Sequence, residues 1–213
     1  MRIDVFTLVP HAFAWLTEQQ PIAGVLGTEL ELRLVNYRET TPLRAGQVDD
    51  EPYGGGAGMV LRVDVVAAAL DAIYGDTRPP RVIALSPQGV PLTQSLVERL
   101  AQEEHIALLS SRFGGFDERI VEHLATDAVS VGPYVLSNGD LPAMVVLDAV
   151  ARRLPGALAE GSGELESFSE ELGGNLEYPH YTRPAEFRGW KVPDVLMSGD
   201  HAKIEAWRRE RVR

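Results

Sequence analysis

The residues best suited to chemistry lie in three short turns rich in glycine, serine and proline, each of which follows an apolar run. The turns cover residues 86–89, 112–116 and 137–140. Such residues tolerate tight backbone conformations and leave N–H and C=O groups free for a ligand. Pro142 suits a first helical turn, so the third turn is expected to lead into a helix N-terminus, which attracts anions and polar ligands. The pattern indicates either a small-molecule site or an ordinary strand-turn-helix corner.

Alternating strands and helices must position these turns. Strands are predicted at 1–9, 29–36, 81–85, 106–110 and 128–136, and helices at 11–19, 22–28, 63–74, 93–104, 118–124, 141–153 and 201–211. Asp117 is expected to cap the helix at 118–124. Strands that alternate with helices favour an α/β fold with a mostly parallel sheet. Ligands of such sheets bind beyond the carboxyl ends of the strands, where the three turns are expected to converge.

The composition is that of an ordinary globular protein, with 213 residues, 45% hydrophobic and 24% charged. The chain has no apolar run of about 18 residues, so no membrane span or membrane partner is expected. Its lack of cysteine excludes disulfides and thiolate metal sites, and the start shows no signal-peptide pattern. These features suit a cytoplasmic protein. The five histidines show no metal-ligand spacing, so no metal site is predicted.

Charge is unevenly distributed along the chain. The net charge of −11 argues against general affinity for nucleic acids, and DNA is not expected as a partner. Residues 157–178 hold six glutamates and no lysine or arginine, whereas residues 179–213 hold eight Lys/Arg against five Asp/Glu. An RNA partner would therefore have to contact local basic patches. The alternative is that these charged residues simply lie on a solvent-exposed helix end and bind no partner.

A glycine run at 54–58 matches the G-x-G-x-G pattern found in Rossmann-type methyltransferases. In those proteins the glycines directly follow a buried strand. Here the acidic and polar segment 49–53 precedes them, so the Rossmann interpretation is rejected. Taken alone, the run predicts a flexible loop within the long aperiodic segment 38–59.

Residues 130–143, Ser-Val-Gly-Pro-Tyr-Val-Leu-Ser-Asn-Gly-Asp-Leu-Pro-Ala, resemble the cofactor loop of the TrmD family, the bacterial tRNA (guanine-N1)-methyltransferases of the SPOUT superfamily. Further matches to this family occur in order along the chain, at 48–59, 85–89, 112–119, 152–156, 179–184 and 192–201. The resemblance therefore covers nearly the whole chain.

The resemblance implies a homodimer with a SPOUT-type, mostly parallel α/β sheet and a C-terminal trefoil knot. It divides the chain into a methyltransferase domain at 1–157, a flexible acidic linker at 158–177 and a small helical C-terminal domain at 178–213. The last domain and the linker would contact tRNA, and this domain is expected to be shortened relative to the family.

The implied reaction is methylation of N1 of guanosine 37 in tRNA by S-adenosylmethionine, and a need for Mg²⁺ stays open. By the same resemblance Glu166 would be the general base and Arg152 would assist it. The residues expected to bind the cofactor are Pro87, Gly89, Ser111, Gly115, Ser130, Val131, Gly132, Tyr134, Leu136, Gly139 and Pro142.

Several residues depart from the family pattern. Glu166 stands in place of an aspartate, Gly114 in place of a glutamate and Pro133 in place of an aspartate. These departures keep alternatives open: a divergent paralogue acting on another RNA nucleotide, or a catalytically impaired RNA- or cofactor-binding homologue. A further alternative is an α/β nucleotide-binding module that is not a methyltransferase.

Overall fold

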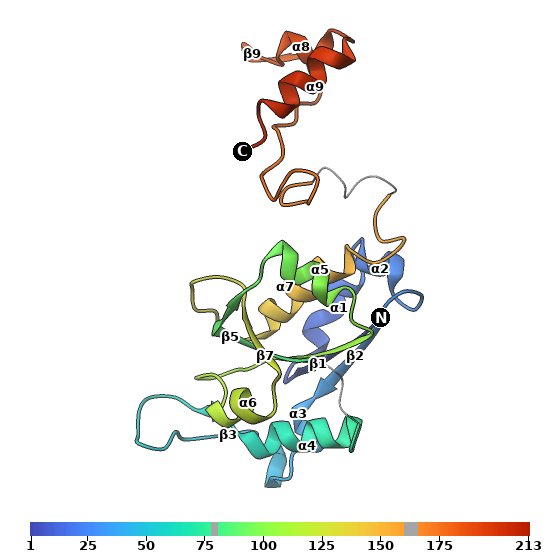
Figure 1. Cartoon of the computed structure of the whole chain (residues 1–213). Helices are drawn as coiled ribbons and strands as arrows, with labels where there is room; N and C mark the ends of the chain where they lie inside the picture. The colour runs from blue at the N-terminus through green and yellow to red at the C-terminus, as the bar shows by residue number, and fades with distance from the viewer. Residues whose placement is uncertain (78–80, 160–165) are drawn as a thin grey trace. The chain divides into compact units, whose positions relative to one another are not determined.

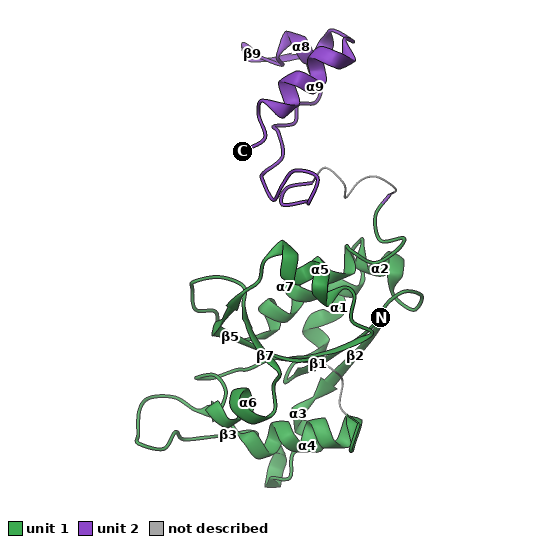
Figure 2. Cartoon of the chain, in the orientation of Figure 1, with its two compact units in different colours: residues 1–158 green, residues 159–213 purple. Residues whose placement is uncertain are grey.

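The computed structural model describes residues 1–77, 81–159 and 166–213, which divide into two compact units at 1–158 and 159–213 (Figure 2). Five parallel strands form the sheet of the first unit in the order β2-β1-β6-β5-β7 (Figure 1). These strands are β1 (Arg2–Thr7), β2 (Glu31–Asn36), β5 (Arg81–Pro91), β6 (His105–Leu109) and β7 (Asp127–Ser130).

Helices cover both faces of this sheet, because successive side chains of each strand point to opposite sides. In β5, for example, Ile83 joins the core beneath one helical layer and Val82 the core beneath the other. The first layer contains α1 (Ala14–Thr17), α2 (Ile22–Val25), α5 (Gln94–Leu100) and α7 (Asp140–Ala151), and the second contains α3 (Tyr37–Thr40), α4 (Val63–Tyr74) and α6 (Glu118–His123) (Figure 1). The predicted α/β class with a parallel sheet is confirmed. So is the cap of α6, where the Asp117 side chain accepts a hydrogen bond from the Arg119 N–H.

Two predicted elements need correction. Strand β7 ends at Ser130 rather than at residue 136, and Val135 is 87% exposed. Pro133 has no N–H to donate to a strand ladder, so the segment leaves the sheet despite its apolar composition. The turn predicted at 86–89 lies within β5, yet Leu85 and Val90 both pair with Val129. The four residues between them therefore bulge out of the ladder.

Short elements replace several longer predictions. The helix expected at 11–19 divides into a 3₁₀ turn, η1 (Pro10–Phe13), and α1, while α2 ends at Val25 because Leu26 is extended. The segment 38–59 is ordered by short elements in place of a continuous loop. These are the end of α3, η2 (Arg44–Gly46) and β3 (Asp49–Asp50), which pairs antiparallel with β4 (Val60–Leu61).

A buried carboxylate links β1 to its neighbours. Asp4 is fully buried and accepts hydrogen bonds from Arg33 (2.8 and 3.0 Å), Tyr74 (2.5 Å) and Arg2 (3.1 Å), and it lies 2.8 Å from His105 Nε2. Burial by itself raises the pKa of Asp4, but the hydrogen bonds from Arg33 and its neighbours outweigh that effect and lower the pKa to about 2. The ionised carboxylate therefore holds β1, β2, β6 and α4 together.

The second unit contains a small hairpin and two helices. Its elements are β8 (Glu186–Phe187), β9 (Trp190–Lys191), α8 (Asp194–Met197) and α9 (His201–Arg209). Trp207 on α9 is buried, with the Tyr181 ring at 6.2 Å and the Arg211 guanidinium at 4.3 Å from its ring.

The predicted linker falls partly outside the described residues, since 160–165 are not among them. Its described part forms hydrogen-bonded turns, in which the Phe168 N–H donates to Asn175 O at 2.8 Å. Leu176 and Arg213 also exchange two backbone hydrogen bonds, of 2.6 and 3.1 Å. The flexibility of the linker stays a prediction.

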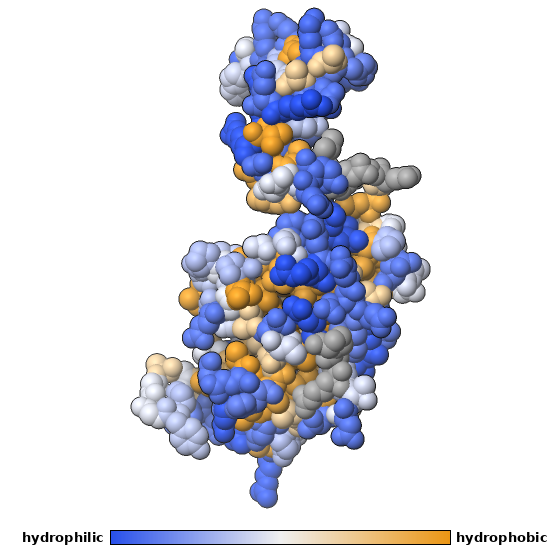
Figure 3. All heavy atoms as spheres, viewed as in Figure 1, coloured by the Kyte–Doolittle hydropathy of each residue, from blue (hydrophilic) through white to orange (hydrophobic). Residues whose placement is uncertain are grey.

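The face seen in Figure 3 is largely hydrophilic, with apolar patches on both units. Among the helices of the described ranges, none combines the length and apolar character that crossing a bilayer requires.

Candidate functional site

A cavity of about 210 Å³ lies where the sequence places the three turns, at the bulge within β5 and at the carboxyl ends of β6 and β7. Its wall comes from segments 85–87, 111–115, 129–132 and 134–139, together with Pro142 at the start of α7. Three stretches that are far apart in the sequence therefore meet at one edge of the sheet, as expected for an open α/β fold.

The structure brings ten of the eleven predicted cofactor residues together around this cavity. They are Pro87, Ser111, Gly115, Ser130, Val131, Gly132, Tyr134, Leu136, Gly139 and Pro142. Gly89 is the exception. A Cβ atom there would lie 2.4 Å from the Ala128 carbonyl carbon and from the Val129 nitrogen, so Gly89 allows β5 to cross closely beside β7.

The turn before α7 packs tightly on the end of β6. The Gly139 N–H donates to Ser111 O at 2.7 Å, and Asn138 Oδ1 accepts from the Asp140 N–H at 3.0 Å. A Cβ atom on Gly139 would lie 2.7 Å from the Ser111 nitrogen. The cavity wall therefore has room for backbone alone at this position.

Directly behind this turn lies a residue that the sequence analysis did not single out. Asp140 is buried, and its Oδ1 accepts hydrogen bonds from Thr7 (2.6 Å) and Ser110 (2.7 Å) at the ends of β1 and β6. Its Oδ2 has no hydrogen-bond partner among the described residues and lies 3.9 Å from Arg112 Nε. An acidic residue in the first turn of a helix, with hydroxyl residues at two strand ends, was the available signal.

Asp140 also acts on a neighbouring buried group. The Tyr37 hydroxyl is buried without a partner in the described chain. Burial, and next the Asp140 charge, raise the pKa of Tyr37 well above its ordinary value. Tyr37 is therefore a neutral core residue.

The second turn of the cavity, at 112–116, forms backbone hydrogen bonds with the residues that directly follow the glycine-rich loop at 54–58. The Gly114 N–H donates to Met59 O at 2.7 Å, and the Leu61 N–H donates to Gly115 O at 3.0 Å. The Asp117 N–H in turn donates to Leu61 O at 3.0 Å. Strand β4 thus runs beside the turn that forms the cavity wall. A Cβ atom on Gly114 would come within 2.9 Å of Met59 O, so this close approach suits glycine.

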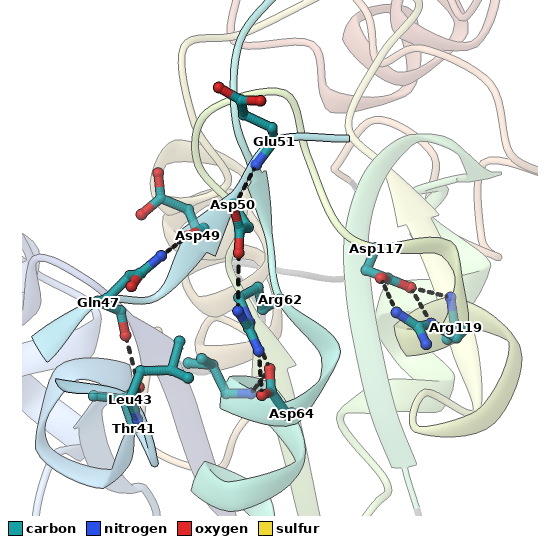
Figure 4. Close-up of polar contacts among 11 residues, drawn as sticks. Thr41, Leu43, Gln47, Asp49, Asp50, Glu51, Arg62, Asp64, Asp117 and Arg119 are labelled. Atoms are coloured by element: carbon teal, nitrogen blue, oxygen red, sulfur yellow. Dashed lines mark hydrogen bonds and ion pairs between the residues drawn. The ribbon is translucent and has the colours of Figure 1, made fainter. Parts of the chain in front are cut away.

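An ion pair joins the two sides of the glycine-rich loop, because Arg62 pairs with Asp50 (2.9 Å) as well as with Asp64 (2.8 Å) (Figure 4). Asp117 pairs with Arg119 at the start of α6 (Figure 4). The hydrogen bond to Asp64 is the main cause of a raised pKa of Arg62, and the hydrogen bond from Arg62 likewise lowers the pKa of Asp64. These groups line a second hollow of about 860 Å³. No buried strand leads into the glycines, which follow the two-residue β3, so the rejection of a Rossmann loop holds.

The two predicted catalytic residues lie in different units. Arg152 ends α7 as its C-cap, and its backbone N–H donates to Asp148 O at 3.1 Å. Glu166 lies in the second unit, where its carbonyl accepts from the Ser169 N–H at 3.0 Å. Each unit is described by itself, so the joint action of these two residues stays a prediction.

No group of three or more histidine, aspartate or glutamate side chains is placed to hold a metal ion within the described ranges. The chemistry that the first cavity offers comes from its backbone groups, hydroxyls and apolar wall. These groups suit a ligand with an apolar ring and several polar atoms.

A parallel α/β sheet with such a cavity beside its strands defines an α/β protein with a candidate small-molecule site. Comparison with known sequences identifies the family within this class. Residues 1–213 match the family described as tRNA (Guanine-1)-methyltransferase TrmD, and the chain belongs to this family. The resemblance found in the motifs is thereby confirmed.

Two relatives illustrate how far the similarity extends. A protein from Brevibacillus brevis named tRNA (guanine-N(1)-)-methyltransferase is 51% identical over 98% of this chain and 85% of its own length. A protein of the same name from Bacillus cereus is 47% identical over 99% of this chain and 86% of its own length.

Proposed function

We propose that this chain transfers a methyl group from S-adenosylmethionine to N1 of guanosine 37 in tRNA. The observation that carries the proposal is the family match over the full chain, combined with the convergence of ten predicted cofactor residues on one cavity. Identities of 47–51% to named methyltransferases favour this reading over a divergent or impaired homologue.

The residues around the cavity fit the proposed cofactor. Gly139 lines the cavity, and its backbone packs so closely on Ser111 that a Cβ atom would push this wall out of place; Gly132 and Tyr134 lie on the same wall. Leu85, Val129 and Leu136 give part of the wall an apolar surface suited to an adenine ring. When bound, S-adenosylmethionine supplies an electrophilic methyl group on its sulfonium sulfur.

The acceptor nitrogen requires help from the protein. Guanine N1 carries a proton and becomes a good nucleophile only when that proton is removed. Glu166 is proposed to accept it, and Arg152 to stabilise the negative charge that develops on O6. Glu166 is one methylene longer than the family's aspartate, so its carboxylate must approach from a backbone placed slightly farther away. No metal ion is required by this scheme.

A homodimer is part of the proposal. Leu141 and Val145, one turn apart on α7, are 54% and 47% exposed, and Val135 in the preceding segment is 87% exposed. Apolar side chains exposed in this way are typical of an interface surface. A second copy of the chain would cover it next to the cofactor cavity.

The remaining family features are proposed on the same basis. The bulge of β5 at 86–89 and the excursion of 131–139 are the segments in which the trefoil knot would form. We assign the methyltransferase role to 1–157, a linking role to 158–177 and tRNA contact to 178–213. The compact unit that ends at Leu158 supports the first boundary. A cytoplasmic location follows from the tRNA substrate.

The test is methyl transfer from labelled S-adenosylmethionine to two tRNA transcripts that differ only at position 37. Transfer to the guanosine transcript but not to the adenosine transcript is the expected result. Equal labelling of both would place the reaction at another nucleotide. No labelling, with cofactor binding intact by calorimetry, would favour the impaired homologue.

A further inference from the structure

The β8–β9 hairpin of the second unit displays two aromatic rings side by side. Phe187 and Trp190 pair directly across the hairpin, with ring centroids 5.9 Å apart and planes at 57°. The two-residue turn Arg188-Gly189 that joins them has positive φ at both positions, 53° and 84°. This is the turn geometry that closes a tight hairpin. The rings are therefore held on a short, well-defined scaffold.

These rings are exposed although their own unit has a core. The exposed fractions are 52% for Phe187 and 69% for Trp190, whereas Trp207 on α9 is 9% exposed. Large aromatic side chains carry much apolar area, and neighbouring exposed ones mark a binding surface.

The hairpin is basic within an acidic protein. Residues 183–191 contain three cations and one carboxylate, whereas the whole chain has a net charge of −11. The one carboxylate, Glu186, is paired with Lys191 at 3.6 Å. The Arg188 guanidinium lies 5.1 Å from the centre of the Phe187 ring, and no carboxylate of the described chain pairs with it. Its N–H groups are available to an anion.

We infer that the β8–β9 hairpin is a stacking platform for an unpaired nucleobase of the tRNA. Trp190 and Phe187 contact the base, and Arg188 contacts a neighbouring phosphate. Stacking on aromatic side chains requires a base splayed out of a helix, as in RNA loops. A protein partner would also cover the rings, but an unpaired cation beside them fits a polyanion better. The inference rests on the proposed function, because it takes tRNA as the substrate.

The first test compares three variants of the full-length protein. Trp190→Ala is expected to weaken tRNA binding by about tenfold. Trp190→Phe should restore most of the affinity, because a ring remains. Trp15→Ala is the matched control, since Trp15 is 65% exposed in the other unit. It should bind tRNA like the wild type. The S-adenosylmethionine affinity should be unchanged in all three.

The second test uses charge. Arg188→Gln should weaken tRNA binding and reduce the slope of log affinity against log salt by about 0.7 to 0.9, the value for one phosphate contact. Trp190→Ala should leave that slope unchanged. Single-stranded RNA should compete for the hairpin better than an RNA duplex of the same length.

Unchanged tRNA affinity in Trp190→Ala would overturn the inference. A shift of Trp190→Ala from dimer to monomer in sedimentation would also overturn it, because the rings would then belong to a subunit contact. Failure of the wild type to methylate the guanosine transcript would refute the proposed function instead. The binding measurements would still report on the hairpin, so the two failures are distinguishable.

Discussion

Asp4 and Asp140 accommodate a buried carboxylate in two different ways. Asp4 accepts hydrogen bonds from Arg2, Arg33 and Tyr74 and lies 2.8 Å from His105 Nε2. In Asp140 one oxygen receives two hydroxyl hydrogen bonds, while the other lies 3.9 Å from the nearest guanidinium nitrogen. The Asp4 carboxylate links strands and a helix of the core, whereas the Asp140 carboxylate supports the turn that forms part of the cavity wall. Each leads to a separate prediction.

For Asp4 we predict a stability change that depends on pH. Its pKa falls from 3.8 to about 2 on folding, so its contribution is complete above pH 3.8 and is lost as pH falls towards 2. That contribution is about 2 kcal/mol. Asp4→Asn should therefore unfold at lower urea at pH 7 and differ less from the wild type near pH 2.5. Asp148→Asn, on α7, is the control. An equal loss at both pH values would contradict the prediction.

Asp140→Ala should cost about 2 kcal/mol of unfolding free energy, because the Thr7 and Ser110 hydroxyls lose their acceptor. The affinity for S-adenosylmethionine should fall as well, since the turn at Gly139 loses its support. Urea titration and calorimetry measure the two effects. Asp140→Glu should regain part of both. Normal cofactor affinity in the alanine variant would show that the turn holds its shape without Asp140.

Glu166→Gln should reduce methyl transfer by roughly 100-fold or more, because the amide cannot accept the N1 proton. Cofactor affinity should stay unchanged. The matched control is Glu170→Gln, an exposed glutamate of the same segment. Single-turnover kinetics with excess enzyme gives the rate of the chemical step. Full activity in Glu166→Gln would move the base to another residue.

At the scale of elements, the helices, strands and caps that depend on hydrophobic periodicity and on turn residues could be predicted from the sequence. The strands of the sheet, α4 and the Asp117 cap follow from local patterns. The end of β7 does not, because an apolar run beside Pro133 looks like a strand until the backbone pairing is known. Asp140 was missed for a similar reason, since its partners Thr7 and Ser110 are distant in sequence. The convergence of the turns on one cavity was predictable, whereas the bonding of Gly114 to Met59 was not.

Gly139→Ala should weaken S-adenosylmethionine binding by about tenfold, because the new methyl group must push Ser111 or the turn aside. Gly24→Ala is a suitable control. Its Cβ would meet only the end of the flexible Gln20 side chain, and its φ is also negative. Isothermal calorimetry on both proteins provides the comparison. Equal affinities would place the cofactor away from this turn.

At the scale of the whole molecule, tRNA must be held by a protein of net charge −11. General electrostatic attraction is therefore weak, and under the proposed function recognition depends on local basic segments such as the hairpin. A second copy of the chain would add a second set of these segments, which raises the effective affinity for one tRNA. The proposed dimer thus bears directly on substrate binding.

Val145→Glu should shift the protein from dimer to monomer, because it places a charge in the proposed apolar interface. Sedimentation velocity measures the mass. Trp15→Glu, at an exposed aromatic position on α1, should leave the mass unchanged. A dimeric Val145→Glu protein with wild-type stability would move the interface elsewhere.

The backbone hydrogen bonds between the glycine-rich loop and the cavity turn couple the ordering of the two segments. A molecule that orders the turn at Gly114 and Gly115 also restricts Met59 and Leu61, so part of the entropy cost of ordering the loop has already been met. A second ligand that contacts the loop then binds more tightly. Such coupling is reciprocal, so each ligand must raise the affinity for the other by the same factor. Under the proposed function, a cofactor in the cavity and a substrate that contacts the loop would therefore each strengthen the binding of the other through these three peptide hydrogen bonds.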